Sequence, residues 1–305
     1  MKTWSDPGFR LLYGTTPPRA GSDDELIEQA AGRLAERLAP LPADAIVVYD
    51  IQDETGRTSA PRPFPFAGTV DPRRYAALLE ARTGRPAIVY KSLGTLDEPA
   101  WRAWLDETAR DWRVRFLSIV GRPTAGVRHA LALSRAIRLA AEHPAGFCVG
   151  GVVIAERHTA ERSESARMLA KSIQGCSYFI SQTVYSPQAT LRLLADYARD
   201  CRGAGLEPRR VVLTFSPAGR ERTISFLKWL GVSVPPETEH AILGAADPLA
   251  RSVEICRENL RRLLPQAAAS LIPIGINVES VSIHRDEIDA SAALLRNLAE
   301  LVAQS

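Results

Sequence analysis

The residues of this sequence that could carry out chemistry gather at the ends of short apolar runs. A carboxyl group that is desolvated there can act as a general acid, and an amide can pair with the edge of a heterocycle by donating and accepting together. The polar residues at these run ends are Asp50, Gln52, Asp53, Glu54, Tyr90, Lys91, Arg122, Glu156, His158, Ser181, Gln182, Tyr185, Asn277 and Glu279. They form one site if the fold brings the run ends together.

The elements that must position these residues follow from the hydrophobic periodicity, because short β-branched runs alternate with segments of helical spacing. We predict strands over Phe9–Thr16, Ala45–Ile51, Pro86–Lys91, Val114–Val120, Phe147–Ile154, Tyr178–Val184, Arg209–Phe215 and Leu271–Val278. Helices are predicted near 24–39, 71–82, 97–111, 126–142, 161–174, 187–203, 219–230, 247–264 and 286–302. Runs such as AIVVY and GGVVIA are typical of parallel strands that are buried on both faces.

Eight strand–helix pairs in 305 residues predict a single (β/α)8 TIM barrel over residues 1–305, with an irregular loop insertion at about 52–71. A doubly wound open sheet is the alternative, but no strand–helix turn carries GxGxxG or a Walker A sequence. In a barrel, the active site lies at the carboxyl ends of the strands, where the polar residues stand.

Composition excludes several classes of function. The net charge of +3 gives no basic face for nucleic acid. No run approaches the roughly 18 apolar residues of a membrane helix, and the amino terminus lacks the apolar core of a signal peptide. The four cysteines stand far apart, which suits neither a zinc site nor a disulfide framework. We therefore expect a cytoplasmic enzyme without a metal, and the absence of GxSxG argues against an activated serine.

Individual roles follow from chemistry. Asp50 and Glu279 both adjoin buried strands, so they are the first candidates for a general acid. A carboxylate at Glu156 would raise the pKa of the His158 imidazole and favour phosphate binding. Lys91 ends a strand, as the Schiff-base lysine of aldolase-type barrels does. That reading stays open as an alternative.

The stretch GGVVIAERHTAERSESARMLAKSIQGCSYFISQTVY resembles the methylenetetrahydrofolate reductase family. Seven positions match the family pattern in order and spacing, namely Glu156, His158, Lys171, Gly175, Ser181, Gln182 and Tyr185. The resemblance extends more loosely from Pro17-Pro18 to the strand that leads into Asn277. It implies a TIM barrel that uses NAD(P)H to reduce 5,10-methylenetetrahydrofolate to 5-methyltetrahydrofolate on FAD. By this resemblance Gln182 would contact the pterin, and His158 with Lys171 would face the phosphate or ribitol region of the cofactor. We add Tyr185, Asn277 and Gln52 to the predicted folate site, and Glu156, Tyr90 and Arg122 to the predicted cofactor site.

Three departures from the family pattern change this expectation. Gly14 stands where the family has its glutamate acid, and Val120-Gly121-Arg122 replaces Arg-Gly-Asp, so a cation stands where an acidic residue contacts the flavin. The 52–71 insertion has no counterpart in the pattern. A two-unit change of charge beside a flavin is large, since each unit at 4 Å is worth about 4 kcal/mol at an effective dielectric of ~20. We therefore expect a divergent branch that transfers hydride from NAD(P)H to the folate without the usual flavin contacts.

Two further expectations remain open. A family member that lacks the glutamate acid could be a non-catalytic binder of folate or nucleotide. Trp101 and Trp104 lie on one face of a predicted helix, and an exposed pair there would favour a homo-oligomer, whereas a buried pair would belong to the core.

Overall fold

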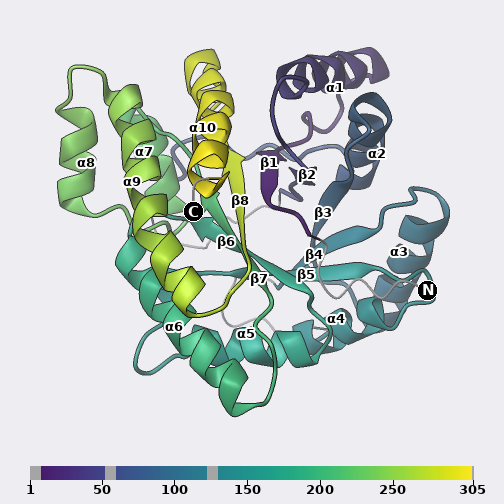
Figure 1. Ribbon diagram of the computed structural model, residues 1–305. Coiled ribbons are helices and arrows are strands. Elements are labelled where there is room, and N and C mark those ends of the chain that lie inside the picture. The colour runs from purple at the N-terminus through teal and green to yellow at the C-terminus, as the bar shows by residue number, and fades with distance from the viewer. Residues whose placement is uncertain (1–7, 52–59, 122–129, 304–305) are drawn as a thin grey trace.

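The strands close into one barrel. The computed structural model describes residues 8–51, 60–121 and 130–303. All eight strands are parallel and follow one another around the barrel in chain order, with β8 pairing back to β1 (Figure 1). They are β1 Leu11–Thr15, β2 Ala45–Val48, β3 Ala87–Ser92, β4 Phe116–Val120, β5 Cys148–Val153, β6 Tyr178–Thr183, β7 Arg210–Phe215 and β8 Ile274–Glu279. The predicted single (β/α)8 barrel is confirmed.

The helices form an outer ring around the strands (Figure 1). They are α1 Asp24–Leu38, α2 Pro72–Thr83, α3 Glu98–Arg110, α4 Leu133–Ala141, α5 Glu164–Ile173, α6 Pro187–Gly203, α7 Glu221–Trp229, α8 Pro236–Leu243, α9 Pro248–Ala269 and α10 Arg285–Ala303, with a 3-10 turn at Ala155–Arg157. Aspartate side chains cap α1, α2, α3 and α9. Helix α8 was not predicted, because its eight residues carry too little periodicity.

Two apolar layers hold the barrel together. One fills its interior, with Leu12, Val47, Ile88, Tyr178 and Val212 among its members, and the other packs the outer faces of the strands against the helices. Because successive strand residues point to opposite faces, β1 to β7 each contribute to both layers, whereas the apolar residues of β8 belong to the outer layer. The interior is tight, since a side chain at Gly150 would meet the Tyr178 ring at 2.2 Å.

The tryptophan pair on α3 belongs to the core. Trp101 is fully buried and donates its indole N–H to the carbonyl of Ala136 on α4 at 3.1 Å. Trp104 stacks on it at a centroid distance of 5.1 Å, beneath the guanidinium of Arg73. Trp101 therefore belongs to the core, and Trp104 is partly buried and packs against it.

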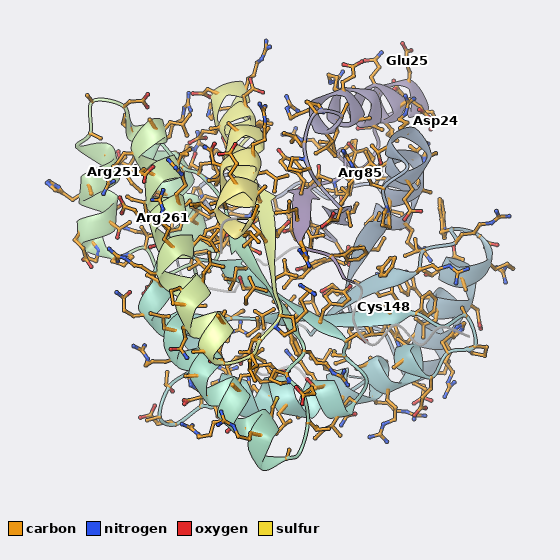
Figure 2. All side chains as sticks on the ribbon, viewed as in Figure 1. Asp24, Glu25, Arg85, Cys148, Arg251 and Arg261 are labelled. Carbon is orange, nitrogen blue, oxygen red and sulfur yellow. The ribbon has the colours of Figure 1, made fainter. Side chains whose placement is uncertain are left out.

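Many charged side chains lie on the outside of the helices, although Arg73, Glu164 and Glu287 are buried. In Figure 2, Asp24 and Glu25 lie on α1, and Arg251 and Arg261 project from α9, whereas Cys148 lies on β5 inside the ring. No described helix is long and apolar enough to cross a membrane. Among the residues with described coordinates, no cluster of metal-ligating side chains was found, and all four cysteines are buried as free thiols.

Candidate functional site

A cavity of about 610 Å³ opens at the carboxyl ends of the strands, and we call it the mouth cavity. This volume suits a small molecule. Its polar floor consists of Tyr49, Tyr90, Gln182, Thr183 and Glu279. Apolar side chains form much of the wall, including Leu93, Ile119, Leu131, Leu133, Ile137, Val152, Ile154 and Leu230. The cavity therefore combines a broad apolar surface with a few polar groups, as sites for heterocyclic ligands do.

A bulge in β6 brings Gln182 to the floor. Ile180 pairs with Val212 and Thr183 with Thr214, so β6 contains one residue more than β7 between these pairs. The Ser181 hydroxyl stabilises the bulge by accepting from the Thr214 N–H at 2.9 Å. A bulge re-aims side chains, and here Ser181, Gln182 and Thr183 all line the cavity. The Gln182 side-chain nitrogen donates to the carbonyl of Leu230 at 2.9 Å.

The Glu279 carboxyl group lies at the floor of the cavity, at the end of β8. The Thr183 hydroxyl donates to it at 3.2 Å, and the Tyr49 hydroxyl is its second hydrogen-bond partner. Burial raises the pKa of Glu279, and these hydrogen bonds only partly oppose the shift. A carboxyl group in this environment keeps its proton to higher pH than an ordinary glutamate does, and it can give that proton to a bound ligand.

Gly14 makes room for this arrangement. Residue 14 on β1 pairs with Glu279 on β8. A side chain at Gly14 would place its Cβ 2.9 Å from the Tyr49 hydroxyl and 3.0 Å from the Glu279 Cβ. The space that a glutamate on β1 would need is therefore filled by groups from β2 and β8. The barrel therefore has glycine at position 14, where the methylenetetrahydrofolate reductase pattern has a glutamate, and it still presents a carboxyl group beside that position.

Asp50 lines the cavity, but its carboxylate is already engaged. It accepts the Ser92 N–H at 2.9 Å and lies 3.7 Å from the Lys91 ammonium. These two contacts occupy the Asp50 carboxylate within the protein. Of the two predicted acids, the geometry favours Glu279.

Lys91 does not face the cavity. In β3, Ile88 and Tyr90 face the interior layer. Because successive strand residues point to opposite faces, Lys91 points outward. Its ammonium lies 5.5 Å from the ring centroid of Trp104 on α3. Lys91 is not among the lining residues, so the expectation that it faces the site, on which the Schiff-base alternative depends, is wrong.

One side of the cavity is cationic. Arg157, Arg162, Arg167 and Lys171 line it together with Glu164. The Lys171 ammonium donates to the Val152 carbonyl at 2.7 Å, and burial lowers its pKa. The predicted position of Lys171 at the site is therefore matched, and this side of the cavity suits an anionic part of a ligand.

His158 and Glu156 lie outside the lining. The His158 ring is nearly buried, with Nε2 2.8 Å from a carboxylate oxygen of Asp196, and its Nδ1 accepts the Glu164 N–H at 3.3 Å. The expected pairing with Glu156 is wrong, because Glu156 accepts from the Ser233 N–H instead, at 3.4 Å. Burial raises the pKa of Glu156. Through Asp196, His158 therefore links the segment that follows β5 to helix α6.

Two of the predicted folate ligands lie behind the cavity surface. Tyr185 is buried against α7 and α9, and its hydroxyl donates to the Ser216 carbonyl at 2.7 Å. Asn277 is fully buried one layer below Glu279, where its amide donates to the Tyr49 hydroxyl at 3.0 Å. Neither side chain lines the cavity, so the expectation of direct contact does not match these positions. Asn277 instead orients Tyr49.

The remaining predicted residues divide into two groups. Tyr90 lines the cavity as expected, with its ring 4.8 Å from that of Tyr49. Gln52, Asp53, Glu54 and Arg122 lie outside the described residues. Sequence reasoning missed Tyr49 and Thr183, although strand alternation could have shown that Tyr49 shares the inward face of Val47.

Comparison with known proteins adds a close relative. No family model matches the chain, and no curated protein matches it. A protein from Clostridium thermocellum that binds two copies of 5-methyl-5,6,7,8-tetrahydrofolic acid is 30% identical, with a TM-score of 0.81 over 96% of both chains. The chain belongs to the family of this Clostridium thermocellum protein. The structure of apo-MsnO8 is 15% identical, with a TM-score of 0.55 over 96% of this chain and 99% of its own, and it shares the fold.

Proposed function

We propose that the protein binds a reduced folate in the mouth cavity and converts 5,10-methylenetetrahydrofolate to 5-methyltetrahydrofolate with NAD(P)H as hydride donor. The observation that carries the proposal is the Glu279 carboxyl group, which occupies the space beside Gly14 and has a raised pKa. The family member from Clostridium thermocellum supports the substrate class, since its ligand is the product of this reaction.

The chemistry requires one proton and one hydride. Protonation of N10 opens the five-membered ring of the substrate and leaves an electrophilic iminium group at N5. Hydride transfer from C4 of the nicotinamide to the methylene carbon then gives the 5-methyl group, and NAD(P)+ leaves. Both reactants must lie in contact for this step, so much of the protein's contribution is orientation.

Particular residues serve these requirements. Glu279 would supply the proton, and the Thr183 and Tyr49 hydroxyl groups hold its carboxyl in place. Gln182 would pair with the edge of the pterin. Arg157 and Lys171 belong to the cationic side of the cavity, which suits the carboxylates of the folate or the phosphates of the dinucleotide.

Of the residues predicted to face the cofactor, Tyr90 and Lys171 line the cavity, whereas His158 is engaged by Asp196 outside it. The position of His158 supports a departure from the usual flavin contacts, and no step of the proposal passes through a flavin. FAD was the cofactor implied by the resemblance, and we propose direct transfer from NAD(P)H in its place.

The proposal is tested by mixing the purified protein with 5,10-methylenetetrahydrofolate and NADH or NADPH under anaerobic conditions. Oxidation of the nicotinamide with formation of an equal amount of 5-methyltetrahydrofolate would support it. An absorption spectrum of the protein as purified tests the flavin separately, because a yellow flavin band would overturn direct transfer.

A non-catalytic folate binder is the second candidate. The printed description of the Clostridium thermocellum relative names binding, and this observation favours it. Tight binding of 5-methyltetrahydrofolate together with no nicotinamide oxidation in the same preparation would select the binder.

A further inference from the structure

The insertion after β2 is attached to α7. We call its described part, residues 60–66, the strap. The indole N–H of Trp229, the last residue of α7, donates to the Ala60 carbonyl at 3.1 Å. Arg222 donates to the Pro63 carbonyl at 2.7 and 3.1 Å and lies over the Phe64 ring at 4.6 Å. The strap is therefore fixed to α7 by hydrogen bonds and by packing.

Arg62 completes the attachment. Its guanidinium lies 5.0 Å from the ring centroid of Phe226 and 5.2 Å from that of Trp229, both on α7. The Phe64 ring meets the Phe226 ring edge to face at 5.3 Å. Cation–π contacts of this kind are worth about 0.5–1 kcal/mol at exposed sites and more when desolvated. Several such contacts hold the carboxyl end of α7 in one place.

Beyond the strap, the chain returns to the loop after β1. The Ala20 N–H donates to the Gly68 carbonyl at 2.8 Å, and the Val70 N–H donates to the Pro18 carbonyl at 2.9 Å. Since β8 lies between β7 and β1 in the barrel, the described part of the insertion, residues 60–70, joins the two sides of the mouth that flank Glu279.

The carboxyl end of α7 also holds Gln182. Leu230, which directly follows Trp229, accepts a hydrogen bond from the Gln182 side-chain nitrogen at 2.9 Å. A carbonyl oxygen can only accept, so the amide must present its nitrogen to Leu230 and turn its oxygen away. The direction of the Gln182 amide therefore depends on where α7 ends.

From this chain of contacts we propose that Trp229 and Arg62 are positioning residues for the folate ring. The strap holds the end of α7, the Leu230 carbonyl fixes the Gln182 amide, and the amide oxygen is left to accept an N–H of the pterin. The inference rests on the proposed folate site. It assigns the strap a role in ligand recognition.

The test is a double-mutant cycle measured by calorimetric binding of 5-methyltetrahydrofolate. Gln182→Ala removes the amide. Trp229→Phe removes the indole donor to Ala60 and keeps an aromatic ring beside Arg62. We expect each to weaken binding, Trp229→Phe by about three- to tenfold for one lost hydrogen bond. If Trp229 acts through Gln182, the double variant binds as weakly as Gln182→Ala alone.

Trp112→Phe is the matched control. Its indole N–H is buried and makes no hydrogen bond in the part of the chain with coordinates, so this variant removes an indole elsewhere and is expected to leave folate binding unchanged. Arg62→Met perturbs the strap side and leaves α7 intact, and it should behave as Trp229→Phe does. Agreement between these two variants supports the proposal.

The outcomes separate this inference from the proposed function. Multiplicative losses in the double variant, or unchanged binding in Trp229→Phe and Arg62→Met, would overturn the positioning role while the folate site stands. Unchanged binding in Gln182→Ala would overturn the pterin contact itself, and the positioning role with it.

Discussion

Replacement of Glu279 by glutamine tests the proposed proton donor with little change of shape. The side-chain oxygen of glutamine can still accept from the Thr183 hydroxyl, which donates to Glu279 at 3.2 Å, and from Tyr49. We therefore expect 5-methyltetrahydrofolate to bind within about threefold of the wild type, because the polar contact is kept. The variant has no acidic proton to give.

The expected loss is therefore in turnover. General acid catalysis contributes about 10²–10⁴-fold, which corresponds to about 2.7–5.4 kcal/mol of the barrier. In the wild type, kcat should fall as the pH rises through the raised pKa of Glu279, since only the protonated carboxyl is active. In Glu279→Gln this limb of the pH profile should disappear.

The assay is steady-state nicotinamide oxidation across pH, with calorimetric folate binding measured in parallel. Glu80→Gln is the matched control, because burial also raises the pKa of Glu80, but its carboxylate accepts the Ala87 N–H at the amino end of β3, away from the mouth. Turnover by Glu279→Gln within threefold of the wild type, with its pH profile intact, would refute the assignment. An equal loss in Glu80→Gln would show that the effect is structural.

Further predictions concern stability and the neighbouring groups. Gly14→Ala places a Cβ 2.9 Å from the Tyr49 hydroxyl, so overpacking should lower the unfolding free energy by about 1–3 kcal/mol and reduce Tm in a thermal melt; an unchanged Tm would contradict the tight fit. A raised pKa means that native Glu279 binds more protons than the unfolded chain above the ordinary value of 4.5, so its contribution to stability falls as pH rises through that window. In denaturant titrations, the unfolding free energy of the Glu279→Gln chain relative to that of the wild type should therefore increase as the pH rises from acidic to neutral. A difference that stays constant with pH would argue against the raised pKa. Lys91→Met should abolish the ion pair with Asp50 and lower stability. Borohydride with a carbonyl substrate should trap no covalent adduct on the wild type. An adduct that forms on the wild type and is absent from Lys91→Met would show that Lys91 forms a Schiff base.

The sequence by itself determined the architecture. Alternation of apolar runs with helical segments is a local property of the chain, because burial on both faces of a parallel strand requires continuous apolar residues. The order of the barrel strands and the position of Glu279 and Gln182 at the strand ends followed from it. Helix α8 (Pro236–Leu243) escaped detection because it is short.

Orientation was decided by the tertiary structure. The extra residue in β6 brings Gln182 and Thr183 to the cavity together, and a bulge depends on pairing with β7, which no local pattern records. Lys91 points to Trp104 rather than into the mouth, since its direction depends on which strand face closes around the interior.

The acid site shows the same division most clearly. The sequence showed that glycine stands at position 14, where the methylenetetrahydrofolate reductase pattern has a glutamate, and that Glu279 ends a predicted strand region. Only barrel closure, which pairs β1 with β8, places Glu279 beside Gly14 and brings Tyr49, which follows β2, against both. These contacts join residues far apart in the chain, and their distances are set by packing, which the sequence does not express as a period or a motif.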